Sequence, residues 1–304
     1  MRRIISLVLV VILLMGIIVG CATKDKNQGP TNLVDPLGNE VLIPENIESI
    51  VSLGPSITQI LVELGLGDKI IAIDTYSTEI EGIKTDLPSI DMMAPDIEQL
   101  IALSPDIILA AGMMMVEGQD PLVQVKDADI AVAYIPTSNS IEEIYSDLEF
   151  ISKAVRLEEK GKDLIDSMKK EIEDMKEIGD IITDKKSVYF EIGAAPYIYS
   201  FGSGVYLSEI LEILGAENIF SELEGWMSLS EEDIIIKDPD IIITNVNYME
   251  DAVGEIKSRD GWQNMKAIKN NQVYYVDNDN SAQPNHNIIK AMKEIAKVIY
   301  PDKF

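Results

Sequence analysis

The sequence predicts an α/β protein built as two similar lobes that are joined by one long helix. Three observations support this: a long amphipathic stripe near mid-chain, a helix–turn–strand pattern on either side of it, and a strand–helix–strand unit near the start. Two consecutive parallel strands need a crossover between them, so that unit indicates parallel sheets covered by helices. A chain of 304 residues is long enough for two such domains.

The chain begins with a hydrophobic leader. Arg2 and Arg3 precede an almost unbroken apolar run, which is typical of an export signal or a single membrane anchor. The run ends in the letters IVGC, which resemble the bacterial lipobox, where cleavage before the cysteine is followed by lipid attachment to its sulfur. Cys21 is the only cysteine of the chain. We therefore expect residues 1–20 to be a lipoprotein signal peptide and Cys21 to anchor the protein to the outer side of the cell membrane.

Residues 21–37 are polar and rich in turn formers, so we expect a flexible tether there. The whole chain has 25 basic and 52 acidic residues, a net charge of −27. Removal of the leader takes away two arginines and brings the net charge to −29. Such an excess argues against nucleic acid as a partner and against docking on anionic lipid.

The predicted N-terminal lobe, residues 38–156, opens with the strand–helix–strand unit. Ile50, Val51 and Leu53 belong to a buried strand, a Gly-Pro-Ser turn follows, and the next strand covers Ile70–Ile73. The two glycines between them, in the letters GLG, stand at the end of a helix and lack a third glycine. They are therefore no dinucleotide-binding fingerprint.

The predicted connecting helix covers residues 157–183. Its apolar residues recur at steps of three and four from Leu164 to Ile182, while charged residues cover the other face. At about 1.5 Å per residue, a helix of about 25 residues is roughly 38 Å long, enough to reach from one domain to another.

A repeated pattern lies on either side of this helix. The chain reads Glu98, six residues and Pro-Asp-Ile-Ile, and it reads the same from Glu232. Each copy predicts a short amphipathic helix, a turn and a buried strand. Self-similarity at this separation predicts two lobes of similar construction, the second over residues 184–304.

Longer segments then show a family resemblance. In order along the chain they read IVSLGPSITQILVELGLGDKIIAIDTYS, SPDIILAAG, GSGVYLSEILEILGAENIF, GWMSLSEEDIIIKDPDIIIT and GWQNMKAIKNNQVYYVDND. Together they resemble the substrate-binding proteins of ABC importers for iron–siderophores, haem and vitamin B12, over essentially all of residues 45–304. The resemblance implies two Rossmann-like lobes on one long helix (the class III, helical-backbone type) with little hinge motion. It also implies a monomer that delivers a small-molecule metal chelate to a permease dimer with its ATPase.

The resemblance gives the two repeated glutamates a role. In this family a surface glutamate from each lobe docks into an arginine pocket of the permease, and the matching positions are Glu98 and Glu232. Two carboxylates far apart on one rigid body fix both orientation and register on a two-fold partner.

The ligand is expected between the lobes, where the carboxyl ends of the parallel strands face each other. The strand ends and the resemblance together nominate eight residues. Aromatic faces and thioethers among them suit a wide, flat, partly apolar ligand. The candidates are Tyr76, Met93, Met113, Tyr199, Trp226, Asn247, Tyr248 and His286.

The ligand's charge is inferred from missing arginines. The mature chain has only Arg156, just before the connecting helix, and Arg259, in a polar loop. Relatives that bind anionic ferric siderophores often present arginines in the cleft, because an anionic chelate needs charge-assisted donors. Their lack favours a nearly neutral cobalt or iron chelate, with a corrinoid such as vitamin B12 first, a ferric siderophore second and haem third.

Haem ligation has one matching position and one broken position. Some haem-binding relatives ligate iron with a methionine ahead of the first docking helix and a histidine after the second Pro-Asp-Ile-Ile strand. Met93 matches the methionine, but Asn247 stands at the histidine position. His286, the only histidine, is either an axial metal ligand or a hydrogen-bonding residue at a helix start. No metal site of the protein's own and no intrinsic cofactor is expected.

Enzymatic function is not expected. The chain contains no H-E-x-x-H, no Walker A loop and no G-x-S-x-G elbow. With one histidine and a lipidated cysteine, the usual bases and nucleophiles are nearly absent. A carboxylate-dependent surface enzyme and a ligand-storing lipoprotein that has no importer are the alternatives from other classes.

Overall fold

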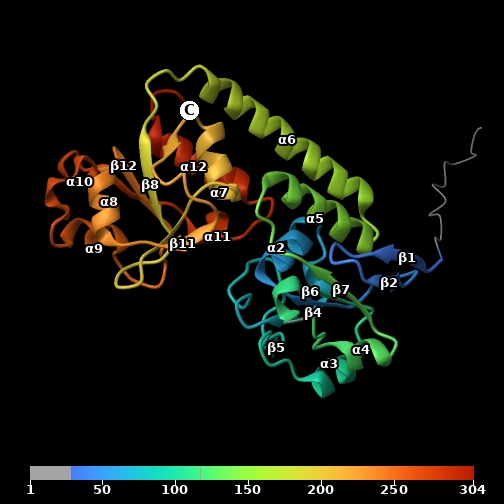
Figure 1. Ribbon diagram of the computed structural model, residues 1–304. Coiled ribbons are helices and arrows are strands. Elements are labelled where there is room, and N and C mark those ends of the chain that lie inside the picture. The colour runs from blue at the N-terminus through green and yellow to red at the C-terminus, as the bar shows by residue number, and fades with distance from the viewer. Residues whose placement is uncertain (1–28, 117) are drawn as a thin grey trace, which may run out of the picture.

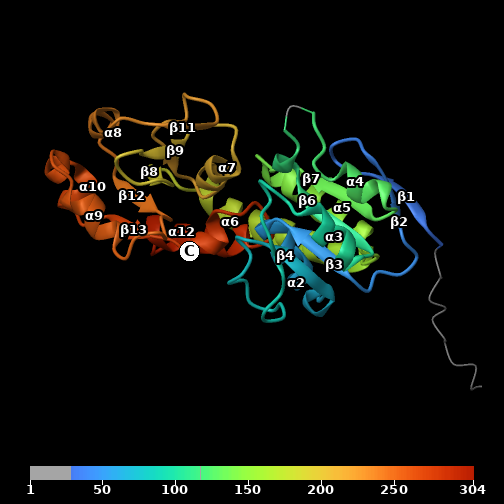
Figure 2. The same cartoon turned by 90° about the horizontal axis from the view of Figure 1, so that it is seen from below.

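The computed structural model describes residues 29–116 and 118–304. The predicted signal peptide and residues 21–28, which include Cys21 and begin the predicted tether, lie outside the described residues. Two α/β lobes lie side by side, and helix α6 (Glu158–Asp180) connects them (Figures 1 and 2). Within residues 29–116 and 118–304, no helix combines the length and the apolar character that a membrane crossing requires.

The N-terminal lobe contains a parallel five-stranded sheet with the order β5-β4-β3-β6-β7. Helices cover both of its faces, because the strands are buried and every connection is a crossover. The strands are β3 (Ile50–Leu53), β4 (Ile70–Asp74), β5 (Ser89–Ile90), β6 (Ile107–Ala111) and β7 (Ala131–Ile135). The helices are α2 (Pro55–Glu63), η1 (Gly67–Lys69), α3 (Ile97–Leu103), η2 (Gly112–Met114), α4 (Val123–Asp127) and α5 (Ile141–Ala154).

An antiparallel hairpin precedes this sheet, formed by β1 (Thr31–Val34) and β2 (Glu40–Ile43). The prediction of a flexible tether is therefore wrong for residues 31–37, which belong to the folded lobe. The buried carboxylate of Asp35 accepts a hydrogen bond from the backbone N–H of Tyr134 on β7, at 2.9 Å. The guanidinium of Arg156 donates to the carbonyl oxygens of residues 43 and 44 and so fastens the end of the hairpin.

The C-terminal lobe contains a parallel four-stranded sheet with the order β10-β8-β12-β13 and an antiparallel ribbon of β9 and β11. The strands are β8 (Ser187–Glu191), β9 (Tyr199–Phe201), β10 (Glu217–Asn218), β11 (Trp226–Ser228), β12 (Ile241–Thr244) and β13 (Val273–Tyr275). The helices are α7 (Tyr206–Ile213), α8 (Glu231–Lys237), α9 (Ala252–Ser258), η3 (Trp262–Asn264), α10 (Lys266–Lys269), α11 (Asn278–Ser281) and α12 (Ile288–Ile299).

The repeated sequence pattern forms the same structure in both lobes. In α3 and α8 the side chain of Asp96 or Ser230 accepts a hydrogen bond from the backbone N–H three residues later, which caps the helix start. Both helices end on a residue in the left-handed conformation, Ser104 with φ 46° and Asp238 with φ 47°. The two short helices are therefore equivalent from first residue to last.

The Pro-Asp turns also play one role in both lobes. The carboxylate of Asp106 accepts hydrogen bonds from the backbone N–H and hydroxyl of Ser49, beside the start of β3. Asp240 does the same with Ser187 at the start of β8. Each aspartate thus ties the beginning of one strand to its neighbour, and the predicted two-lobed α/β fold is confirmed.

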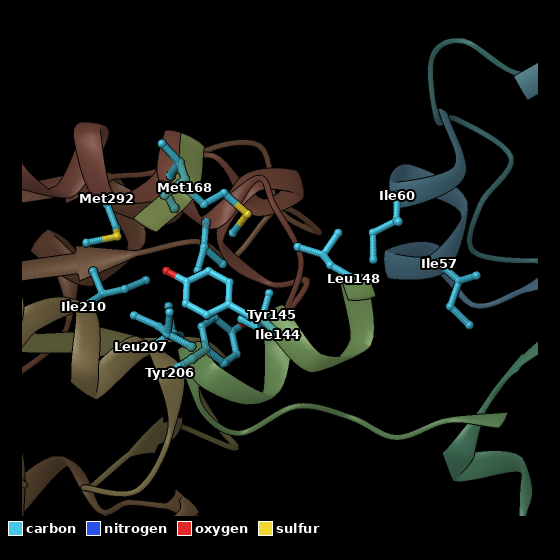
Figure 3. Packing of buried hydrophobic residues seen from close by; sticks show 14 of the residues in the cluster. Ile57, Ile60, Ile144, Tyr145, Leu148, Met168, Tyr206, Leu207, Ile210 and Met292 are labelled. Atoms are coloured by element: carbon cyan, nitrogen blue, oxygen red, sulfur yellow. The ribbon is translucent and has the colours of Figure 1, made fainter. Parts of the chain in front are cut away.

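One of the hydrophobic clusters runs from one lobe into the other. Side chains of α2 and α5 in the first lobe, of α6, and of α7 and α12 in the second belong to one buried cluster (Figure 3). Two glycines seat α6 closely at either end: a Cβ on Gly161 would lie 2.1 Å from Ser152 Oγ, and one on Gly179 would lie 2.0 Å from Ile213 O. Close-packed contacts of this kind resist bending, so we expect the separation of the lobes to change little.

Candidate ligand cleft

In the part of the chain that the structure describes, three cavities open at the carboxyl ends of the parallel strands. The largest, of about 490 Å³, lies between the lobes and is lined by α2 and the segment after β4 on one side and by the segment from Asp277 to Lys290 on the other. A second, of about 200 Å³, lies in the N-terminal lobe after β5 and β6. The third, of about 390 Å³, lies in the C-terminal lobe after β12 and β13. This is where parallel-sheet proteins bind ligands.

The cavity between the lobes brings together one predicted residue from each lobe, Tyr76 and His286. Tyr76 is directed outward by a local turn, because the buried carboxylate of Asp74 at the end of β4 accepts a hydrogen bond from its backbone N–H at 2.8 Å. Tyr76 as a whole is 72% exposed. A flat side chain therefore stands free at the mouth of this cavity.

The same local device positions Met93. The carboxylate of Asp91, just after β5, accepts a hydrogen bond from the Met93 backbone N–H at 2.9 Å. Met113 lies in η2, directly after β6, and both methionines line the cavity of the N-terminal lobe. Two predicted residues that are far apart in sequence are thus brought together.

The other predicted residues are more scattered. Asn247 lines the cavity of the C-terminal lobe, whereas Tyr248 and Tyr199 line none of the three. The Tyr248 hydroxyl oxygen accepts a hydrogen bond from the backbone N–H of Ala194 at 2.8 Å. Sequence reasoning missed Tyr275, which shares the Asn247 cavity and could have been found because it ends β13.

Trp226 lies at the contact between the lobes. Its indole packs edge-on against the rings of Phe201 and Tyr206, with ring centres 5.7 and 6.0 Å away. Its Nε1 donates to the side-chain oxygen of Asn139 in the other lobe at 3.4 Å. Trp226 therefore helps to join the lobes, although it lines none of the three cavities.

The cavity between the lobes is strongly acidic, a feature that sequence reasoning also missed. Five carboxylates line it, and the only cationic side chain among its lining residues is Lys290. The carboxylates belong to Glu63, Glu79, Glu81, Asp277 and Asp279. Acidic surface segments are common in a chain of this net charge. Nothing in the local sequence therefore distinguished these five carboxylates from the many that face solvent elsewhere.

Neither Arg156 nor Arg259 lines any of the three cavities. Arg156 fastens the N-terminal hairpin, and Arg259 is buried rather than placed in a polar loop. Its guanidinium donates to both carboxylate oxygens of Glu191, at 2.7 and 2.8 Å, and also to Glu255. Since Glu191 ends β8, this ion pair anchors the carboxyl end of one of the two inner strands of the second lobe.

His286 is a buried neutral imidazole. Burial, with a smaller contribution from Lys290, lowers the pKa of His286 to about 4. Glu63 Oε2 lies 3.6 Å from His286 Nε2, and a carboxylate there would favour the charged imidazolium. The Glu63 side chain is half exposed, however, so water screens its charge, and the burial of His286 has the larger effect on the pKa. Nδ1 is buried and has no hydrogen-bond partner among the described residues.

This lowered pKa predicts a pH dependence of stability. The unfolded chain takes up the His286 proton near pH 6.5, whereas the folded chain resists it until about pH 4. Stability from this group is therefore complete above about pH 6.5 and is lost as the pH falls toward 4, by up to about 3 kcal/mol. We expect thermal unfolding curves of the wild type and His286→Gln to diverge over that range, with the wild type losing more. Parallel pH profiles would show that the imidazole is solvated.

Glu98 and Glu232 occupy equivalent places on α3 and α8, one residue after the first residue of each helix. Both are exposed, and neither has a hydrogen-bond or ion-pair partner within residues 29–116 and 118–304. Figure 1 shows the two helices on different lobes. They therefore present one carboxylate from each lobe to solvent.

In the described part of the chain, no group of three or more histidine, cysteine or acidic side chains is arranged to hold a metal ion. Two facing lobes on one helix, with an open cavity between their strand ends, define a two-lobed substrate-binding protein of class III.

Comparison with known proteins agrees. A family model described as periplasmic binding protein matches residues 50–280. The chain therefore belongs to this family, and the resemblance inferred from the sequence is confirmed.

Individual relatives cover almost the whole chain. An uncharacterized ABC transporter substrate-binding lipoprotein of Bacillus subtilis, YvrC, is 34% identical over 90% of this chain and 87% of its own length. A vitamin B12-binding protein of Vibrio campbellii is 28% identical over 82% of this chain and 88% of its own. A solved structure from Staphylococcus epidermidis, described as a possible iron-binding (periplasmic solute-binding) protein, has a TM-score of 0.73 and 31% identity, covering 84% of this chain and 99% of its own.

Proposed function

We propose that this protein is the extracytoplasmic, lipid-anchored substrate-binding component of an ABC importer. It captures a metal chelate between its lobes and delivers it to a permease dimer. The observation that carries this proposal is the cavity between the lobes, which is lined from both sides at the strand ends. The names of the relatives from Bacillus subtilis and Vibrio campbellii support a substrate-binding function, and the word lipoprotein in the first of them supports the extracytoplasmic location. On this proposal the protein binds its ligand stoichiometrically as a monomer and has no turnover.

The cargo that the cavity favours is a neutral chelate whose rim donates hydrogen bonds, and a corrinoid fits that description best. Carboxylates repel the propionates of haem and the charge of an anionic ferric siderophore, but they accept hydrogen bonds from amide groups. Both arginines of the mature chain are engaged elsewhere, so they offer no compensating charge. Ferric siderophore and haem are the second and third choices within the same family.

The direct test is a titration of the full-length protein in detergent. The probes are cyanocobalamin, haemin and an anionic ferric tris-catecholate, followed by tryptophan fluorescence and visible absorbance. Trp226 is the useful reporter, because Trp262 is fully buried against Arg259. We expect cyanocobalamin to bind at least roughly tenfold more tightly than either anion. Preferential binding of the catecholate would overturn the argument from charge while leaving the importer role intact.

A charge variant sharpens this test. We expect Glu79→Gln with Glu81→Gln to strengthen binding of the anionic chelates several-fold and to change cyanocobalamin binding little, because repulsion is removed only for the anions. Glu158→Gln with Glu159→Gln, on exposed positions of α6, makes the same change of net charge away from the cavity. Equal effects of the two double variants would mean that only total charge matters.

Two further assays separate the alternatives from other classes. An enzyme that uses carboxylates would release product in excess over protein, whereas a binder changes its ligand at most stoichiometrically. A storage lipoprotein would bind the chelate, but deletion of its gene would leave chelate uptake unchanged. Loss of uptake on deletion supports the importer role.

A further inference from the structure

The cavity of the N-terminal lobe is lined in part by two pairs of methionines, and the two members of each pair are consecutive in sequence. Met92 and Met93 follow β5, and Met113 and Met114 lie in η2. In each pair one thioether is buried in the core, that of Met92 or Met114, and the other is exposed: Met93 is 66% exposed and Met113 56%. The chain has 13 methionines, and among those that the structure describes these two alone are exposed. Both exposed thioethers therefore lie in one cavity.

The rest of this cavity offers little other chemistry. Among the described residues that line it, the only charged side chain is that of Asp120, which accepts hydrogen bonds from the Tyr134 hydroxyl at 2.5 Å and from Lys126 Nζ at 2.8 Å. The two exposed sulfur atoms are thus the reactive atoms of this wall. An aliphatic side chain would supply the same apolar surface without that reactivity.

We infer that Met93 and Met113 form a reversible oxidation site that lowers the affinity of the cleft for its ligand, an inference that rests on the proposed function. The oxidant is a peroxide outside the cytoplasm. A sulfur lone pair attacks one peroxide oxygen, the O–O bond breaks, and water leaves after proton transfer. The sulfur is oxidised by two electrons to the sulfoxide, and the peroxide is reduced by two.

The sulfoxide weakens binding because it converts an apolar surface into a strong hydrogen-bond acceptor. When a ligand covers this acceptor, its bound water is lost, and none of the described lining residues supplies a free cation to replace it. An unpaired buried polar group of this kind lowers affinity by roughly tenfold. Met92 and Met114 escape oxidation at the same peroxide dose because the core encloses their sulfur atoms.

Mass spectrometry tests the site itself. Full-length protein in detergent is treated with increasing hydrogen peroxide, and sulfoxide is measured at each methionine by fragment-ion localisation. We expect Met93 and Met113 to oxidise first and at similar doses, ahead of the half-buried Met115, Met227 and Met249 and far ahead of Met92 and Met114. Oxidation of Met115, Met227 or Met249 at the same dose would overturn the selectivity on which the inference depends.

Calorimetric titration with cyanocobalamin tests the consequence. We expect roughly tenfold weaker binding once both sites are sulfoxides, and recovery after treatment with methionine sulfoxide reductases of both stereospecificities. Met92→Leu with Met114→Leu should lose affinity on peroxide treatment as the wild type does. Met93→Leu with Met113→Leu should show the same affinity before and after treatment, whatever its starting value.

The outcomes separate this inference from the proposed function. Unchanged cyanocobalamin affinity in protein that carries both sulfoxides overturns the inference and leaves the proposed function standing. If untreated protein binds none of cyanocobalamin, haemin and the ferric catecholate, the proposed function fails and the effect on affinity fails with it. The peroxide series then still decides, by mass alone, whether the two methionines are a selective oxidation site.

Discussion

The double variant Glu98→Ala with Glu232→Ala should lose chelate uptake by roughly a hundredfold or more while its chelate affinity stays unchanged. Truncation of a charged partner in a buried interface pair typically costs 2–5 kcal/mol, which is a factor of about thirty or more at each site. Both carboxylates are exposed on short helices, away from the three cavities, so their removal leaves the ligand contacts intact. Uptake is measured in cells or in vesicles that contain the permease and its ATPase.

The two sites should act as a unit because the protein is rigid between them. The shared core and the close seating of α6 at Gly161 and Gly179 fix the separation of the lobes. Two carboxylates at a fixed separation can engage two equivalent pockets of a two-fold permease at once. The single variants should therefore retain partial uptake, since the remaining carboxylate still docks and the rigid body keeps the second lobe in register.

A matched control uses two other exposed glutamates. Glu159→Ala with Glu177→Ala removes the same charge from α6, where no docking is expected. This variant should transport like the wild type. Unimpaired uptake in the Glu98 and Glu232 double variant would show that these residues do not dock the permease. Equal loss of uptake in both double variants would indicate an effect of net charge.

Local sequence signals predicted most of the frame. The apolar stripe predicted a helix over 157–183, and α6 covers Glu158–Asp180. The repeated Pro-Asp-Ile-Ile pattern predicted two equivalent units because helix caps and turns are set by neighbours in sequence. Met93 and Met113 were both nominated for the cleft, Met113 because it follows a predicted strand and Met93 through the family resemblance, and the fold brings the two into one cavity.

Features that depend on distant partners could not be predicted. The hairpin at residues 31–43 has two strands of only four residues each, and Asp35 meets Tyr134 only in the folded lobe. Trp226 was predicted to bind ligand because it is an aromatic residue at a family position, but its hydrogen bond to Asn139 crosses between lobes. A single sequence contains no signal for either pairing, because nothing local restricts which remote residue completes it.

Arg259 is the strongest case of this kind, and its removal should strongly destabilise the fold. Arg259→Ala should lower the free energy of unfolding by about 3–5 kcal/mol, because it leaves buried Glu191 without its countercharge. The side chains of Arg259 and Glu191 are 4% and 1% exposed. The guanidinium also stacks on the Trp262 ring at 4.6 Å. Lys269→Ala removes an equal charge from an exposed position of α10 and should change stability by less than about 0.5 kcal/mol.

The pH dependence of this loss identifies its cause. Burial already raises the pKa of Glu191, and Arg259 is the main influence that lowers it. Without Arg259 the carboxyl group should bind a proton in the folded state at higher pH than in the unfolded chain, so stability should rise as the pH falls. The deficit of Arg259→Ala relative to wild type, measured by thermal unfolding, should therefore be smaller at pH 5 than at pH 8.

Replacing both partners, as Arg259→Met with Glu191→Leu, should recover part of the lost stability because no unpaired charge is left in the core. A deficit that is the same at both pH values, and is not reduced in the double variant, would mean that lost packing rather than a stranded charge destabilises the lobe.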